Sequence, residues 1–105
     1  MARFEKVEFH FLGSEEDCRL IGQVLVREGK KGQEMVLDID DPEGYSPYLI
    51  VGTRRKSTFC FTGANSARHA TANVQASWAE IDEGYVGRWI EDGEVCLFEF
   101  KIPGS

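Results

Sequence analysis

The sequence predicts an all-β protein of about eight antiparallel strands joined in consecutive hairpins. Apolar and polar residues alternate with a period of two along nearly the whole chain, which is typical of strands with one buried face. Turn-forming residues separate the alternating segments, and no stretch has the period of an amphipathic helix. The 105 residues, of which 42% are hydrophobic, are enough for one domain over 1–105 with a single core.

Turn chemistry marks the boundaries in the first half of the chain. The segment Gly29-Lys30-Lys31-Gly32 separates the second alternating run from the third. After the third run, Asp41-Pro42-Glu43-Gly44 fits a type I turn, because Pro fixes φ at the second position. The first four expected strands are Phe4–Leu12, Arg19–Arg27, Glu34–Asp40 and Pro47–Thr53.

In the second half, a short apolar run lies between the charged run Arg54-Arg55-Lys56 and a longer polar segment. Glu83-Gly84 and Asp92-Gly93 then mark two hairpins, and Asp-Gly is a strong signal for a two-residue type I′ loop. The last four expected strands are Ser57–Thr62, Thr71–Ile81, Tyr85–Glu91 and Glu94–Ile102.

The Asp92-Gly93 loop predicts the register of the last hairpin. In this register one face of the hairpin carries Tyr85, Trp89, Cys96, Phe98 and Phe100. If Glu83-Gly84 is likewise a two-residue loop, Trp78 lies opposite Trp89 on this same face. We expect this face to belong to the core. The predicted pairs are Ile90 with Val95, Trp89 with Cys96, Gly87 with Phe98 and Tyr85 with Phe100.

The other strands contribute further large apolar residues to the same interior. The face of the second strand stays open, because Ile21 and Leu25 compete with Val24 and Val26 for the inside. Short joints between consecutive strands predict a small barrel or a two-sheet sandwich, filled by its own side chains. The remaining expected inward residues are Val7, Phe9, Phe11, Val24, Val26, Met35, Leu37, Ile39, Phe59, Phe61, Val74 and Ile102.

Charge and cysteine content exclude several classes of function. The net charge of −6 disfavours general binding to nucleic acid or to anionic membranes, since both select basic surfaces. No apolar run reaches the roughly 18 residues of a membrane helix, and MARFEKVEFHF does not have the pattern of a signal peptide. The cysteines Cys18, Cys60 and Cys96 are odd in number and too far apart for a CxxC metal pair, which predicts reduced thiols and no metal site. We expect a cytoplasmic protein without a cofactor.

Two patterns contain residue types that could carry chemistry. Cys60 with His69 would be a nucleophile and a base, but no third orienting group accompanies them, which favours a structural cysteine and a protein that is not an enzyme. The run from Asp38 to Glu43 has several carboxylates close together, as calcium sites do. Pro42 interrupts it and no Glu stands at the twelfth position, so a solvated turn is preferred and calcium stays open.

The distribution of charge predicts a basic end. Antiparallel consecutive strands place successive loops at alternate ends, so the second, fourth and sixth loops share one end. Asp82 and Glu83 in the sixth loop partly offset the positive charge of the other two loops. We expect this end to dock an anionic group or an acidic surface. Arg68 and His69 lie in the long fifth loop, at the opposite end with three acidic loops. The five cations of the basic end are Lys30, Lys31, Arg54, Arg55 and Lys56.

Two functions of different classes follow from these patterns. The first is a non-catalytic interaction module, binding a protein partner or another copy through the reverse face of the last hairpin, which carries Val86, Ile90, Val95 and Leu97. We expect this face to be covered. The alternative is a small-molecule-binding barrel or modest enzyme with a pocket near Arg68 and His69. Trp78 and Trp89 are further candidate contacts in that pocket.

Overall fold

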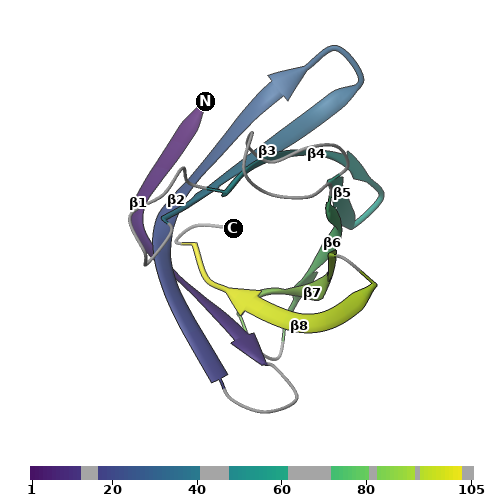
Figure 1. Ribbon diagram of the computed structural model, residues 1–105. Coiled ribbons are helices and arrows are strands. Elements are labelled where there is room, and N and C mark those ends of the chain that lie inside the picture. The colour runs from purple at the N-terminus through teal and green to yellow at the C-terminus, as the bar shows by residue number, and fades with distance from the viewer. Residues whose placement is uncertain (13–16, 41–47, 62–71, 81–82, 92, 103–105) are drawn as a thin grey trace.

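The chain forms eight strands and closes them into one antiparallel barrel in sequence order (Figure 1). The structure is a computed structural model and describes residues 1–12, 17–40, 48–61, 72–80, 83–91 and 93–102. The predicted all-β fold is confirmed, and of the two predicted architectures the barrel is the correct one. The strands are β1 (Ala2–Leu12), β2 (Asp17–Gly29), β3 (Gly32–Ile39), β4 (Tyr48–Arg55), β5 (Thr58–Phe61), β6 (Ala72–Ala79), β7 (Gly84–Glu91) and β8 (Glu94–Phe100).

The first strand closes the barrel because it pairs with both β2 and β8. Its register with β2 shifts between Phe4 and Val7, where Lys6 has a φ of 57°. Such a bulge bends a strand and increases its twist. The half of β1 after the bulge pairs with β8, from Phe9 opposite Phe100 to Leu12 opposite Leu97.

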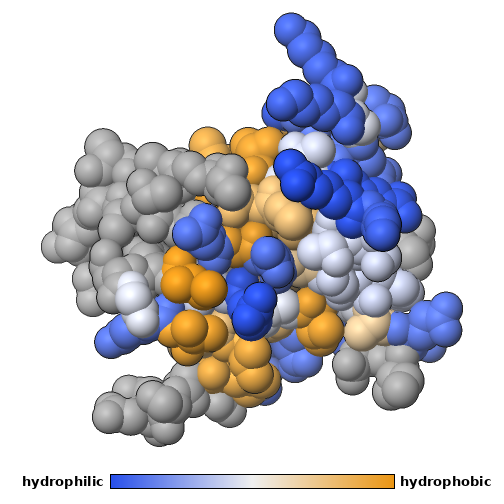
Figure 2. Space-filling model, turned by 90° about the vertical axis from the view of Figure 1, so that its right-hand side faces the viewer, coloured by the Kyte–Doolittle hydropathy of each residue, from blue (hydrophilic) through white to orange (hydrophobic). Residues whose placement is uncertain are grey.

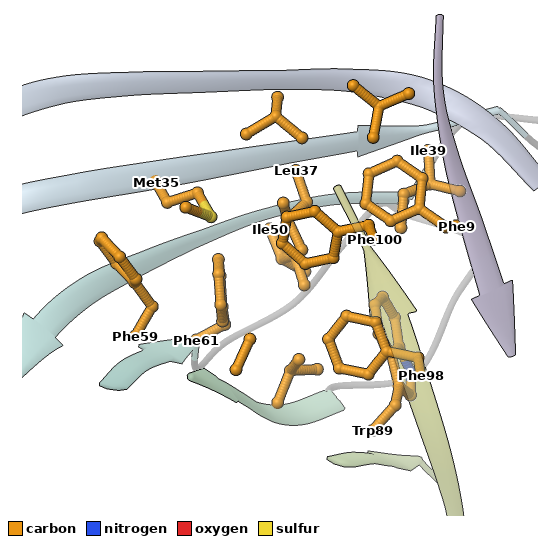
Figure 3. Close-up of a cluster of buried hydrophobic side chains, with 14 of the residues drawn as sticks. Phe9, Met35, Leu37, Ile39, Ile50, Phe59, Phe61, Trp89, Phe98 and Phe100 are labelled. Carbon is orange, nitrogen blue, oxygen red and sulfur yellow. The ribbon is translucent and has the colours of Figure 1, made fainter. Parts of the chain in front are cut away.

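The middle of the barrel is filled by its own side chains, as predicted. Side chains from opposite walls point toward one another across the interior (Figure 3). Val24 is fully buried and Ile21 is 47% exposed, which settles the open face of β2. Four further residues that the sequence predicts inside are partly buried against this core: Phe11, Val26, Tyr85 and Cys96. The buried core is Val7, Phe9, Val24, Met35, Leu37, Ile39, Ile50, Phe59, Phe61, Val74, Ala76, Trp89, Phe98, Phe100 and Ile102.

Glycine is required where this packing brings two strands or a ring close to the backbone. A Cβ at Gly87 would lie 1.7 Å from the carbonyl oxygen of Gln75 on β6. At Gly52 it would lie 2.5 Å from the ring of Phe61. Both glycines therefore shape the interior of the barrel.

The register of the last hairpin is confirmed for all four predicted pairs, with Glu91 opposite Glu94 beside the two-residue loop. The predicted pairing of Trp78 with Trp89 is wrong, because Trp78 lies opposite Tyr85 and Val74 opposite Trp89.

The cause of this error is the turn between β6 and β7. The last pair before it is Ala79 with Gly84, so the connection is longer than two residues. Glu83 has a φ of 51°, and its N–H donates to the carbonyl of Glu80 at 3.2 Å. The shift in register is an even number of residues, so each side chain keeps the face that the sequence predicted.

Candidate functional site

The apolar residues predicted on the reverse of the last hairpin lie together on the outside of the barrel. Ile90 is directly opposite Val95, and Leu97 is opposite Arg88 in the next outward row. Val95 is 62% and Leu97 52% exposed, so the described part of the chain leaves both uncovered.

The closure of the barrel extends this surface onto β1. Leu12 lies directly opposite Leu97 and is 40% exposed. The sequence alone does not place Leu12 on this surface, because its position opposite Leu97 depends on the pairing of the first strand with the last. We call the five residues Leu12, Val86, Ile90, Val95 and Leu97 the outer apolar face.

Charged residues of both signs border the outer apolar face. Arg88 is exposed and pairs across the strands with Leu97, while Glu99 pairs with Val86. Glu99 also accepts a hydrogen bond from Nδ1 of the half-buried His10 on β1, at 3.2 Å. This contact fixes the carboxylate of Glu99 beside the apolar residues. The face thus has a cation and an anion at diagonal positions around Leu97.

A second apolar row crosses the outside of β2, β3 and β4. Leu25 lies opposite Val36, and Val36 lies opposite Val51. Leu49 follows on β4 and is 46% exposed. In Figure 2, which shows the side of the barrel where β4, β5 and β6 lie in Figure 1, apolar side chains gather in the middle of the face among single polar ones. This row was not among the predicted sites, although the alternation within each strand marks its residues as outward-facing.

The five predicted cations come together at one end of the barrel. Lys30 and Lys31 lie in the turn between β2 and β3, which projects at the top of Figure 1. The top of the molecule in Figure 2 is hydrophilic. Arg54 and Arg55 are the last residues of β4 rather than loop residues, and Lys56 begins the β4–β5 turn. All three lie at the same end as the two lysines, as the register of β3 with β4 requires.

The two arginines of this basic end have different orientations. Ile50 and Gly52 are buried, so the alternation of β4 turns Arg54 toward the barrel mouth and Arg55 outward. Arg54 Nε donates to the carbonyl of Lys56 at 2.7 Å, and its Nη1 donates to Oε1 of Gln33 at 3.2 Å. These bonds hold the guanidinium at the mouth of the barrel.

Arg68 and His69 lie outside the described residues, as do most of the predicted acidic loops. Trp78 and Trp89, the other two candidate contacts of the predicted pocket, do not lie opposite each other. Trp89 is buried in the core, whereas Trp78 lines a hollow at the basic end.

The three thiols of the chain are free. Cys18 is exposed, and Cys60 and Cys96 are half-buried. Burial raises the pKa of the Cys96 thiol above its ordinary value of 9.0, and the neighbouring Cys18 raises this pKa further. The described residues hold no group of three or more His, Cys, Asp or Glu side chains arranged to bind a metal ion.

No protein-family model matches the chain, and searches of curated proteins and of solved structures find no match. In the part of the chain that the structure describes, there is no helix long and apolar enough to cross a membrane.

Proposed function

We propose that this protein is a non-catalytic interaction module that self-associates through the outer apolar face. The proposal rests on three exposed apolar side chains that lie together. Val95 and Leu97 are both on β8, and Leu12 of β1 lies opposite Leu97. Contiguous apolar surface of this kind is typical of protein interfaces, since burying it removes its contact with water.

The partner that fits this face is a second copy of the chain. Arg88 and Glu99 lie at diagonal corners around Leu97 and Val86. A two-fold axis along the line from Leu97 to Val86 would bring each of these apolar residues onto its own counterpart. The same axis would place Arg88 of each copy against Glu99 of the other, so that two symmetry-related ion pairs form. Two-fold dimers with such self-complementary surfaces are the commonest form of oligomer.

A non-catalytic role is supported by the surroundings of the described thiols. Cys60 lies on β5 opposite Thr53 of β4 and Gln75 of β6, so neither cross-strand neighbour is a base that would activate it. Three free thiols also support a reducing compartment, and we place the protein in the cytoplasm as part of this proposal.

Sedimentation equilibrium tests the proposal. The unmodified chain should sediment as a dimer at micromolar concentrations, and Leu97→Lys should sediment as a monomer because it places a charge in the interface. Leu49→Lys is the matched control, since Leu49 has similar exposure on the opposite wall. It should leave the dimer intact.

Two results would contradict the proposal. One is a monomer at every concentration of the unmodified chain. The other is dissociation by Leu49→Lys but not by Leu97→Lys, which would assign the interface to the apolar row of β2, β3 and β4.

A further inference from the structure

The basic end of the barrel has a hollow of about 730 Å³ at its mouth. A volume of this order is typical of sites for small molecules. It lies above the filled middle of the barrel and is bounded by seven of the eight strands or their turns. The lining residues are Ala2, Phe4, Val26, Gln33, Arg54, Ser57, Phe59, Trp78, Glu80, Tyr85 and Ile102.

The floor and walls of this hollow are mainly apolar and aromatic. Trp78 and Tyr85 contact edge to face with ring centroids 5.4 Å apart, and Phe59 and Tyr85 do so at 6.0 Å. Phe59 is buried and Trp78 is half-buried, so the rings pass from the core into the open hollow. Such a surface favours a ligand with an apolar or aromatic body.

The rim has one oriented cation. Arg54 lines the hollow, and its hydrogen bonds to Gln33 and to the carbonyl of Lys56 fix the plane of its guanidinium. A guanidinium has five N–H donors in a fixed fork, more than these two bonds use, and the fork matches a carboxylate in geometry.

The other charges at this end limit the charge of the ligand. Lys30 and Lys31 in the β2–β3 turn and Arg55 at the end of β4 add positive potential. Glu80 lines the same rim from the end of β6 and opposes an anion near its own carboxylate. With one arginine and one glutamate in its lining, the hollow fits a single negative charge better than a polyphosphate.

We propose that the hollow binds an amphipathic organic monoanion, with its carboxylate on Arg54 and its apolar body against Phe59, Trp78 and Tyr85. The ligand class is a monocarboxylate with a hydrocarbon chain or a fused aromatic ring. This site is independent of the self-association proposed above, because the outer apolar face lies on the outside of β7, β8 and β1.

Calorimetric titration with three probes tests the site: decanoate, 2-naphthoate and the uncharged decan-1-ol. We expect the unmodified chain to bind at least one of the two carboxylates, and the tighter of them identifies the body as a chain or a ring. Arg54→Gln should weaken that binding about tenfold, since it removes a charge-assisted hydrogen bond, and should leave the binding of decan-1-ol unchanged.

Arg55→Gln is the matched control, because it removes the same charge from the next residue, which faces outward. It should change carboxylate binding by less than about twofold, as expected for a screened charge. Trp78→Phe should abolish the ligand-induced change in tryptophan fluorescence, and Leu97→Lys should bind the probe like the unmodified chain.

Three results would overturn the proposal. The first is that neither carboxylate binds the unmodified chain. The second is equal weakening by Arg54→Gln and Arg55→Gln, which would mean general attraction to a basic surface. The third is a fluorescence response that survives Trp78→Phe, which would place the ligand elsewhere. Thermal unfolding of each variant separates these results from a loss of the fold.

Discussion

Leu97 and Leu12 lie directly opposite each other across the pairing of β8 with β1, where the end of the chain closes the barrel against its beginning. One residue earlier on β1 and one later on β8, Phe11 and Phe98 form the corresponding inward pair, with stacked rings 5.7 Å apart. The same closure therefore completes the core on the inside and the outer apolar face on the outside.

The close approach of β6 and β7 makes Gly87 a sensitive position. Gly87→Ala should lower the free energy of unfolding by about 2 to 4 kcal/mol, since the new Cβ would overlap the carbonyl of Gln75 and force the strands apart. Urea unfolding measures this change. Gln75→Ala keeps that carbonyl and alters an exposed side chain, so its effect should stay below about 0.5 kcal/mol. Equal effects of the two substitutions would disprove the close approach.

The filled interior predicts a large cost for removing an aromatic ring. Phe98 is 1% exposed and packs against Phe11, Trp89 and Phe100. Phe98→Ala should lower the free energy of unfolding by about 3 to 5 kcal/mol, because it leaves a cavity as well as losing buried area. Ile21→Ala, on the outside of β2, should cost less than about 1 kcal/mol. A loss below 1 kcal/mol for Phe98→Ala would contradict a packed core.

Alkylation distinguishes the thiols. Only the thiolate reacts, and burial raises the pKa of Cys96 above 9.0, so Cys96 should react slowly with iodoacetamide at pH 7.5. Its rate should keep rising as the pH passes 9. Exposed Cys18 should be modified first, as peptide mass spectrometry of briefly treated protein will show. Rapid modification of Cys96 at pH 7.5, in protein that keeps its near-ultraviolet circular dichroism, would contradict its inward position on β8.

Features that depend on neighbouring residues in the sequence were predictable. Alternation identified the strands and the faces of their side chains, and Asp92-Gly93 set the register of the last hairpin because a two-residue loop leaves one pairing. The β6–β7 register was not predictable in the same way, since Glu83 takes a positive φ that glycine normally supplies.

Features that depend on distant strands needed the structure. Leu12 joins the outer apolar face only through the pairing of β1 with β8. The hollow at the basic end likewise depends on which inward residues of separate strands meet at one mouth. The alternation of β4 already separates Arg54 from Arg55, but it does not show that Arg54 lines the same hollow as Trp78 and Tyr85. The cations were predictable as a group, and their arrangement around a hollow was not.

The most direct test of self-association through the outer apolar face is a charge exchange followed by sedimentation equilibrium. Arg88→Glu should weaken the dimer roughly tenfold, because it sets two like-charged pairs across the two-fold axis. Combining Arg88→Glu with Glu99→Arg should restore the affinity to near that of the unmodified chain, since each pair then has opposite charges again. Failure of the double variant to recover, while both variants unfold at similar temperatures, would contradict the proposed pairing and the interface with it.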